Sequence, residues 1–152
     1  MKKILCLLLV LLSVMLSSCS QIEDTNGPDD YSIVTFTDED ILKGAINTIT
    51  VGSFRSSSFI GDELKGTYKV SKLSGMVEIE KISSDRSNIN FDIDFTCESG
   101  NAMLVIVSKG RIVKKIEANE KVNFDITNSN DYYNLLLVGE SAKASVKYKV
   151  VC

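Results

Sequence analysis

Asp92 and Asp94 are the carboxylates whose spacing could most readily support chemistry. Two residues apart on a strand, they would face the same way at roughly 7 Å, a separation compatible with glycoside hydrolysis by paired carboxyl groups. A second acidic group at 38–40 is the other candidate for this chemistry, and either group could instead supply the oxygen ligands that calcium prefers. Because the pair alternates with Ile93 and Phe95, and no EF-hand spacing is present, we favour a solvated sheet face.

The chain contains no histidine, which removes most other routes to catalysis. Ser-His-Asp triads and Cys-His pairs cannot form, and the usual zinc-binding sets lose a ligand. No Ser-x-x-Lys spacing, no Gly-x-Gly-x-x-Gly and no Walker loop occurs, so a serine–lysine dyad and nucleotide binding have no support. We therefore predict a protein that is not an enzyme and that uses no cofactor or metal.

Aromatic side chains are the remaining candidates for ligand contact, because flat rings stack on sugars. Tyr132 and Tyr133 are adjacent, so one should point outward if the other packs inward. Phe54 and Phe59 flank the polar residues 55–58, which we interpret as a small loop. Either pair could line a shallow binding surface. The alternative is that the four rings pack in the core and at its rim.

From Tyr31 onward, apolar and polar residues alternate, as in strands with one buried face. The pattern predicts an all-β domain over 31–152, an antiparallel β-sandwich or jelly roll of about eight or nine strands. The segments 103–107 and 135–138 are apolar throughout, so they should be central and covered on both faces. The expected strands are 31–37, 46–51, 67–73, 76–82, 89–97, 103–107, 122–126, 135–138 and 143–150.

Turn residues separate these expected strands. The segment 108–111 contains Lys109-Gly110 and predicts a tight hairpin, and further turns are expected at 73–75 and 99–101. Near the start of the domain, Thr37 could cap a short helix that Gly44 would end, although a strand connection is an alternative.

The first nineteen residues follow a pattern of their own. Lys2 and Lys3 precede an apolar run at 4–16, and two small residues come directly before Cys19, an order typical of an export signal. A transmembrane helix is one alternative, but thirteen residues span about 20 Å as a helix against a hydrocarbon core of about 30 Å. A secretory signal without lipid is the other.

The residues Leu16-Ser17-Ser18-Cys19 resemble the lipobox of bacterial lipoproteins at every position. The resemblance implies cleavage after Ser18, a diacylglyceryl group on the thiol of Cys19 and a new amino terminus that could be acylated. The sandwich would then follow a signal helix at 1–18 and a flexible polar tether at 19–30. The segments 100–107 and 137–144 are also similar to small β-sandwich lipoproteins of bacteria, mostly uncharacterised, which supports the fold without adding an activity.

Two cysteines would remain in the mature chain besides Cys19, and export would permit them to form a disulfide. By strand parity, Cys97 and Cys152 both point to the apolar face of their strands. A bond between them would close a loop of 55 residues and stabilise by roughly 4 kcal/mol, less any strain. Two separate thiols are the alternative, and the sequence does not decide between them.

The net charge limits which classes of partner the protein is expected to bind. The chain has 17 basic and 20 acidic residues, and losing Lys2 and Lys3 with the signal would leave a net charge of −5. With no basic cluster, nucleic acid is not an expected partner, and membrane contact would come from the lipid on Cys19.

We therefore expect an exported accessory or interaction module, anchored by lipid to the outer face of the cell membrane or to the outer membrane. Its partner would be an envelope polysaccharide or a protein. A carbohydrate-binding module is the main alternative. A structural or envelope-stress protein and a histidine-free hydrolase are others.

Overall fold

The computed structural model describes residues 36–44, 46–84, 87–127 and 131–152 of the chain. The expected signal at 1–18, the tether at 19–30, Cys19 and most of the expected strand at 31–37 lie outside the described residues. The described strands are all antiparallel and belong to one sheet, so the predicted all-β class is confirmed. They are β1 (Ile49–Val51), β2 (Phe54–Ile60), β3 (Glu63–Ser84), β4 (Asn88–Ser108), β5 (Arg111–Glu117), β6 (Glu120–Thr127) and β7 (Asp131–Val151).

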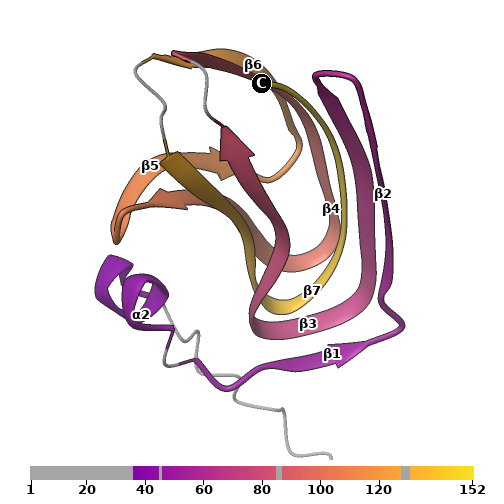
Figure 1. Cartoon of the computed structure of the whole chain (residues 1–152). Helices are drawn as coiled ribbons and strands as arrows, with labels where there is room; N and C mark the ends of the chain where they lie inside the picture. The colour runs from indigo at the N-terminus through magenta and orange to yellow at the C-terminus, as the bar shows by residue number, and fades with distance from the viewer. Residues whose placement is uncertain (1–35, 45, 85–86, 128–130) are drawn as a thin grey trace, which may run out of the picture. The chain divides into compact units, whose positions relative to one another are not determined.

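The sheet has the order β1-β3-β7-β4-β5, with β2 also beside β3 and β6 also beside β4. Its three long strands, β3, β4 and β7, each bend near the middle, so one sheet folds into both layers of the sandwich (Figure 1). The first layer contains β2, residues 63–70 of β3, 144–151 of β7, 90–97 of β4, and β6. The second contains the other halves of the long strands together with β5.

The bends lie where the strand registers shift, at 70–75 in β3 and at 97–101 in β4. Each bend holds a residue in the left-handed region: Gly75 (φ 116°), Gly100 (φ 73°) and, in β7, Ser141 (φ 49°). A Cβ on Gly100 would lie 2.5 Å from the carbonyl oxygens of Glu140 and Ser141, so the bends also pack closely on one another. The expected turns at 73–75 and 99–101 are therefore bends within continuous strands. With the bend at Ser141, six of the expected strands merge into the three long strands β3, β4 and β7, whereas β2 and β5 were not among the expected strands. The described residues therefore form seven strands.

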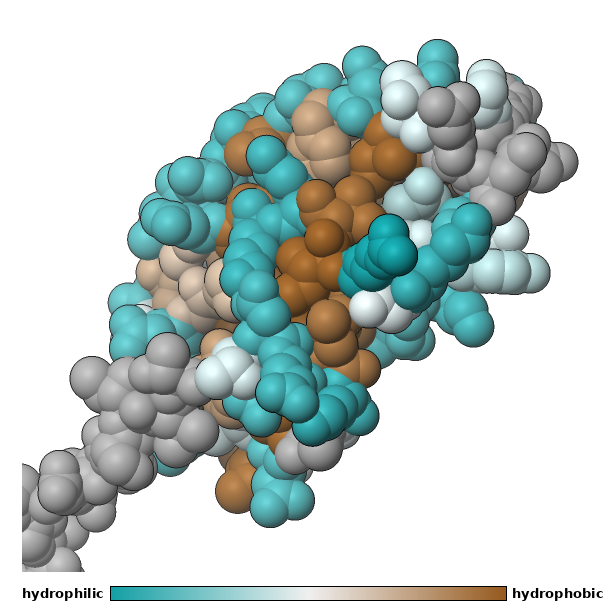
Figure 2. Space-filling model, turned by 90° about the vertical axis from the view of Figure 1, so that its left-hand side faces the viewer, coloured by the Kyte–Doolittle hydropathy of each residue, from teal (hydrophilic) through white to brown (hydrophobic). Residues whose placement is uncertain are grey.

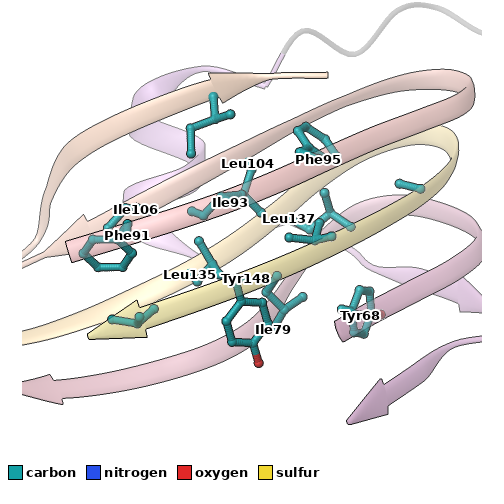
Figure 3. Close-up of a cluster of buried hydrophobic side chains, with 14 of the residues drawn as sticks. Tyr68, Ile79, Phe91, Ile93, Phe95, Leu104, Ile106, Leu135, Leu137 and Tyr148 are labelled. Carbon is teal, nitrogen blue, oxygen red and sulfur yellow. The ribbon is translucent and has the colours of Figure 1, made fainter. Parts of the chain in front are cut away.

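The core lies between the two layers (Figure 3). Phe91, Ile93 and Phe95 of β4 are at most 1% exposed, and Leu135 and Leu137 of β7 are fully buried. Residues of this size contribute roughly 1.5–3 kcal/mol each when fully buried. The predicted alternation at 89–97 is thus the alternation between the core and the outer face of the first layer.

Helix α2 (Asp38–Lys43) confirms the helix expected between Thr37 and Gly44. The Thr37 hydroxyl accepts a hydrogen bond from the main-chain N–H of Asp40 (3.2 Å), whose carboxylate accepts one from the N–H of Thr37 (2.9 Å). Gly44 ends the helix in the left-handed conformation. No helix among the described residues combines the length and apolar character needed to cross a bilayer.

Helix α2 covers the outer face of the second layer. Ile41 is 2% exposed and packs with Val105, Leu136 and Val138 in a second apolar cluster. The strand segments 103–107 and 135–138 therefore have apolar neighbours on both faces, as their sequences predicted.

Candidate functional site

The most distinctive surface of the described part is a sheet edge formed by β1 and β2. Both strands pair with β3, β1 at 72–74 and β2 at 63–69, and no described strand pairs with the other side of β2 (Figure 1). Every residue of β1 and β2 is exposed. We call residues 49–60 the edge segment.

The interpretation of residues 55–58 as a loop is wrong, because they form the middle of β2. Three consecutive serines interrupt the alternation of apolar and polar residues, so the sequence pattern did not predict a strand here. The missed signal was the two-residue connection Gly61-Asp62, which joins β2 to β3 with Ile60 paired to Glu63. Glycine with positive φ at the first position of a two-residue loop, as at Gly61 (φ 61°), is typical of a β-hairpin.

The main-chain groups on the free side of β2 can be assigned from one hydrogen bond. The N–H of Cys152 donates to the carbonyl of Asp62 (2.9 Å), so the even-numbered residues of this part of β3 face β7. The odd-numbered ones face β2, where their partners are its even-numbered residues. Arg55, Ser57 and Phe59 therefore point their N–H and C=O groups away from β3, toward the open edge.

The edge segment also carries most of the exposed apolar side chains. Of the eight large hydrophobic residues that are exposed in the described part, five lie on it: Ile49, Val51, Phe54, Phe59 and Ile60. The most exposed are Ile60 at 77%, and Ile49 and Phe59 at 64% each. Free edges are normally protected by charge or proline, and β5 and β6 at the opposite side follow that rule with several Lys, Arg, Asp and Glu residues. Strand β2 contains no proline, and Arg55 is its one charged residue.

The charge of Arg55 is already neutralised within the domain. Its guanidinium contacts the carboxylate of Glu80 at 2.8 Å, and the hydroxyl of Tyr148 donates to the same carboxylate at 2.5 Å. Glu80 is only 8% exposed. Burial, and then this hydrogen bond to Glu80, raise the pKa of Tyr148 well above its ordinary value. The cluster ties β2 of the first layer to β3 in the second.

Tyr148 reaches Glu80 by passing over Gly66, where a Cβ would lie 2.1 Å from the ring. Figure 3 shows the Tyr148 hydroxyl pointing away from the aliphatic side chains of the core. The glycine is thus required by close packing rather than by its backbone conformation.

A shallow polar depression of about 400 Å³ lies on the outer face of the first layer. Asp92 and Asp94 line it, on the face opposite the core, as their alternation predicted. Its other charged residues are Lys65, Lys121, Lys147 and Lys149. Among the described residues, no three His, Cys, Asp or Glu side chains gather in a way that could hold a metal ion.

A third surface lies between β5 and β6, where the two layers are open at one side. Figure 2 shows this side of the domain, with a band of apolar surface flanked by hydrophilic residues. A cleft of about 450 Å³ there is lined by Ile112, Val113 and Ile126. At its margin Lys109 pairs with Asp131 at 2.9 Å and holds the pKa of that carboxyl below its usual value.

The adjacent tyrosines divide as predicted, one inward and one outward. Tyr133 is 4% exposed and packs edge-on against Phe91 with ring centroids 6.1 Å apart. Tyr132 is 60% exposed, and the ammonium of Lys81 lies 5.4 Å from its ring centroid. Only Tyr132 could therefore contact a ligand directly. Phe54 and Phe59, the other aromatic candidates, are both exposed.

The structure does not bring Cys97 and Cys152 together, so the disulfide expected as one alternative is not formed. Cys97 pairs with Ala144 of β7, and Cys152 directly follows the end of that strand, eight residues further along the chain. Eight residues of strand span about 26 Å, far beyond the reach of a disulfide. Strand alternation correctly placed both side chains on the apolar face. The pairing of β4 with β7, however, puts the two cysteines far apart along the strand direction. Burial raises the pKa of the Cys97 thiol.

No family model and no curated protein matches the chain. Among solved structures, the chain is similar to a protein of Bacillus endospore appendages, described as a novel family of disulfide-linked pili. The identity is 9%, over 68% of this chain and 90% of that one, with a TM-score of 0.45.

Two further solved structures show weaker similarity. An RmlC-like cupin protein from Desulfovibrio desulfuricans shares 8% identity over 65% of this chain and 81% of its own, with a TM-score of 0.36. The protein BH2720 from Bacillus halodurans shares 15% over 79% and 84%, with a TM-score of 0.35. With TM-scores below 0.5, none of the three supports an inference about this chain.

Proposed function

We propose that the chain is an exported lipoprotein, anchored through Cys19, whose sandwich is a non-catalytic interaction module at the cell envelope. Its partner is an extended polypeptide segment that adds as a strand to the free edge of β2. The observation that carries this proposal is the edge segment itself, a strand edge that no described strand pairs with, that exposes apolar side chains at both ends of β2, and whose one charge, on Arg55, is paired with Glu80.

Strand addition fits the two kinds of group on this edge. The main-chain groups of Arg55, Ser57 and Phe59 can supply the hydrogen bonds that give affinity in this mode of binding. The apolar side chains of Phe54 and Ile60 flank the serines on the outer face, where an added strand would cover them.

The edge is tested by photo-cross-linking in cells that express the full chain. A photoreactive amino acid at Phe59 should give covalent adducts with a second polypeptide. The same amino acid at Thr96, an exposed residue on the central strand β4, is the matched control and should give few. Equal adduct yields at the two positions would contradict the proposal that the edge is the interaction surface.

The anchor is tested separately with Cys19→Ala. Without the thiol, the diacylglyceryl group cannot be attached, so the variant should leave the membrane fraction or accumulate as unprocessed precursor. Fractionation and incorporation of a labelled fatty acid measure both effects. Normal processing and membrane retention of Cys19→Ala would refute the lipoprotein assignment while leaving the edge proposal untouched.

Carbohydrate binding is a second candidate, supported by the polar depression on the first layer. Its serine, threonine, lysine and aspartate side chains offer donors and acceptors suited to hydroxyl groups. Saturable binding of an envelope polysaccharide to the detergent-solubilised full chain should fall in Lys147→Ala and be unchanged in Tyr132→Ala. No saturable binding across neutral and acidic polysaccharides would eliminate this candidate.

A further inference from the structure

We propose that the strand added to β2 is β2 of a second copy of this chain, in an antiparallel pair related by a two-fold axis through Ser57. The inference rests on the proposed function and specifies its partner. It follows from the order of residues in β2, Phe-Arg-Ser-Ser-Ser-Phe-Ile, in which the three central serines and the apolar ends are symmetric about Ser57, while Arg55 and Phe59 are not.

The hydrogen-bonding pattern allows this pairing. Arg55, Ser57 and Phe59 carry the open main-chain groups, and an axis at Ser57 places Ser57 opposite itself and Arg55 opposite Phe59 of the second copy. Those pairs would form about six main-chain hydrogen bonds between the copies. An axis shifted to Ser56 or Ser58 leaves residues at one end of β2 unpaired. Only the axis at Ser57 pairs all seven.

The side chains are complementary in the same register. On the outer face, Phe54 lies opposite Ile60 of the second copy, and Ser56 lies opposite Ser58. Each end of the ribbon therefore buries an aromatic–aliphatic pair, and its centre places small hydroxyl groups together. Both side chains are exposed in the single chain, Phe54 at 56% and Ile60 at 77%.

No charge opposes the pairing. Arg55 is the only charged residue of β2, and the carboxylate of Glu80 neutralises it within each copy. The ring of Phe59 from the second copy would lie beside the aliphatic stem of Arg55, a contact that does not require the guanidinium to leave Glu80.

Pairing of two seven-residue strands buries less than the 1,200–2,000 Å² typical of stable complexes, so the dimer should be weak for free molecules. A common membrane raises the local concentration of the copies, which favours such a weak contact. The self-association should therefore be measured on the full chain in membranes.

The test is disulfide formation in membranes between full chains that carry an added cysteine. Ser57→Cys should form a cross-linked dimer on mild oxidation. Lys69→Cys is the matched control, on the same sheet but one strand from the edge, so its copies would be separated by at least roughly 14 Å. We expect about tenfold more dimer from Ser57→Cys than from Lys69→Cys or from the natural chain.

The register is tested with Ser56→Cys and Ser58→Cys. Each variant alone should cross-link weakly, whereas the two expressed together should cross-link strongly, because position 56 faces position 58 of the other copy. Dimer from Ser57→Cys at the level of the Lys69→Cys control would overturn the self-pairing. If photoadducts at Phe59 then contain a different protein, the proposed function stands and only the identity of the partner is wrong. If there are no such adducts, both fail.

Discussion

At the scale of single residues, Glu80 lies in the interior, whereas the alternation of apolar and polar residues in the sequence would place it on the solvated face. Strict alternation from Val77 puts Glu78 and Glu80 on the same, solvated face. The register shift between them inserts Ile79 as an extra residue, so Glu80 pairs with the buried Leu135 and turns inward. A bulge depends on the partner strand, so the sequence of β3 alone does not reveal it.

The hydrogen bond from Tyr148 to Glu80 should contribute measurably to stability. Tyr148→Phe removes the hydroxyl that donates this hydrogen bond, so one carboxylate oxygen of the buried Glu80 loses its donor. This loss should lower the free energy of unfolding by about 1–2 kcal/mol. Urea unfolding measures the loss. Tyr132→Phe, which alters an exposed ring, is the control and should change stability little. Equal effects of the two substitutions would contradict the role given to Tyr148.

The same tyrosine predicts a dependence on alkaline pH. An unfolded tyrosine ionises near pH 10, whereas burial and Glu80 raise the pKa of Tyr148 in the folded chain. The stability linked to this shift is fully present below about pH 10 and is lost as pH rises from there toward the folded pKa. In a pH titration followed by absorbance at 295 nm, Tyr148→Phe should show one fewer tyrosine that ionises above pH 10 than the natural chain. The free energy of unfolding of Tyr148→Phe should also fall less steeply above pH 10 than that of the natural chain. A natural chain whose tyrosines all titrate near pH 10 would contradict this prediction.

At the scale of secondary-structure elements, the sequence correctly predicted those features that depend on a few neighbouring residues. Thr37 and Gly44 gave the helix, the alternation at 89–97 gave the core face of β4, and Lys109-Gly110 gave a hairpin whose residues both have positive φ. The bends at Gly75 and Gly100 had the composition of turns. Whether such residues end a strand or bend it depends on the neighbouring strands, since β7 continues beside both.

The close passage of Tyr148 over Gly66 gives an element-scale prediction. Gly66→Ala should displace the tyrosine ring and lower the free energy of unfolding by about 1–3 kcal/mol. In a Tyr148→Leu background, the same substitution should cost much less, because the shorter side chain no longer lies over position 66. A double-mutant cycle from urea unfolding measures this coupling. Additive effects would show that Gly66 is required for another reason.

At the scale of the whole molecule, the described strands form one sheet folded on itself into a sandwich, and no other described strand pairs with its two outer edges. The charged strands β5 and β6 protect one side, and β1 with β2 leave an apolar edge at the other. The sequence contained the residues of this edge, and Phe54 and Phe59 were already candidates for binding. It could not show that they lie on an unpaired strand, because that depends on where β2 sits in the sheet.

The most direct measurement compares photoadducts at Phe59 in the natural full chain and in Ser57→Pro, in cells. Proline at position 57 removes an N–H that points to the open edge and leaves the pairing of β2 with β3 intact. We predict that the adducts are lost while the melting temperature is nearly unchanged. Adducts that persist at the natural yield in a folded Ser57→Pro chain would contradict binding through the free edge of β2.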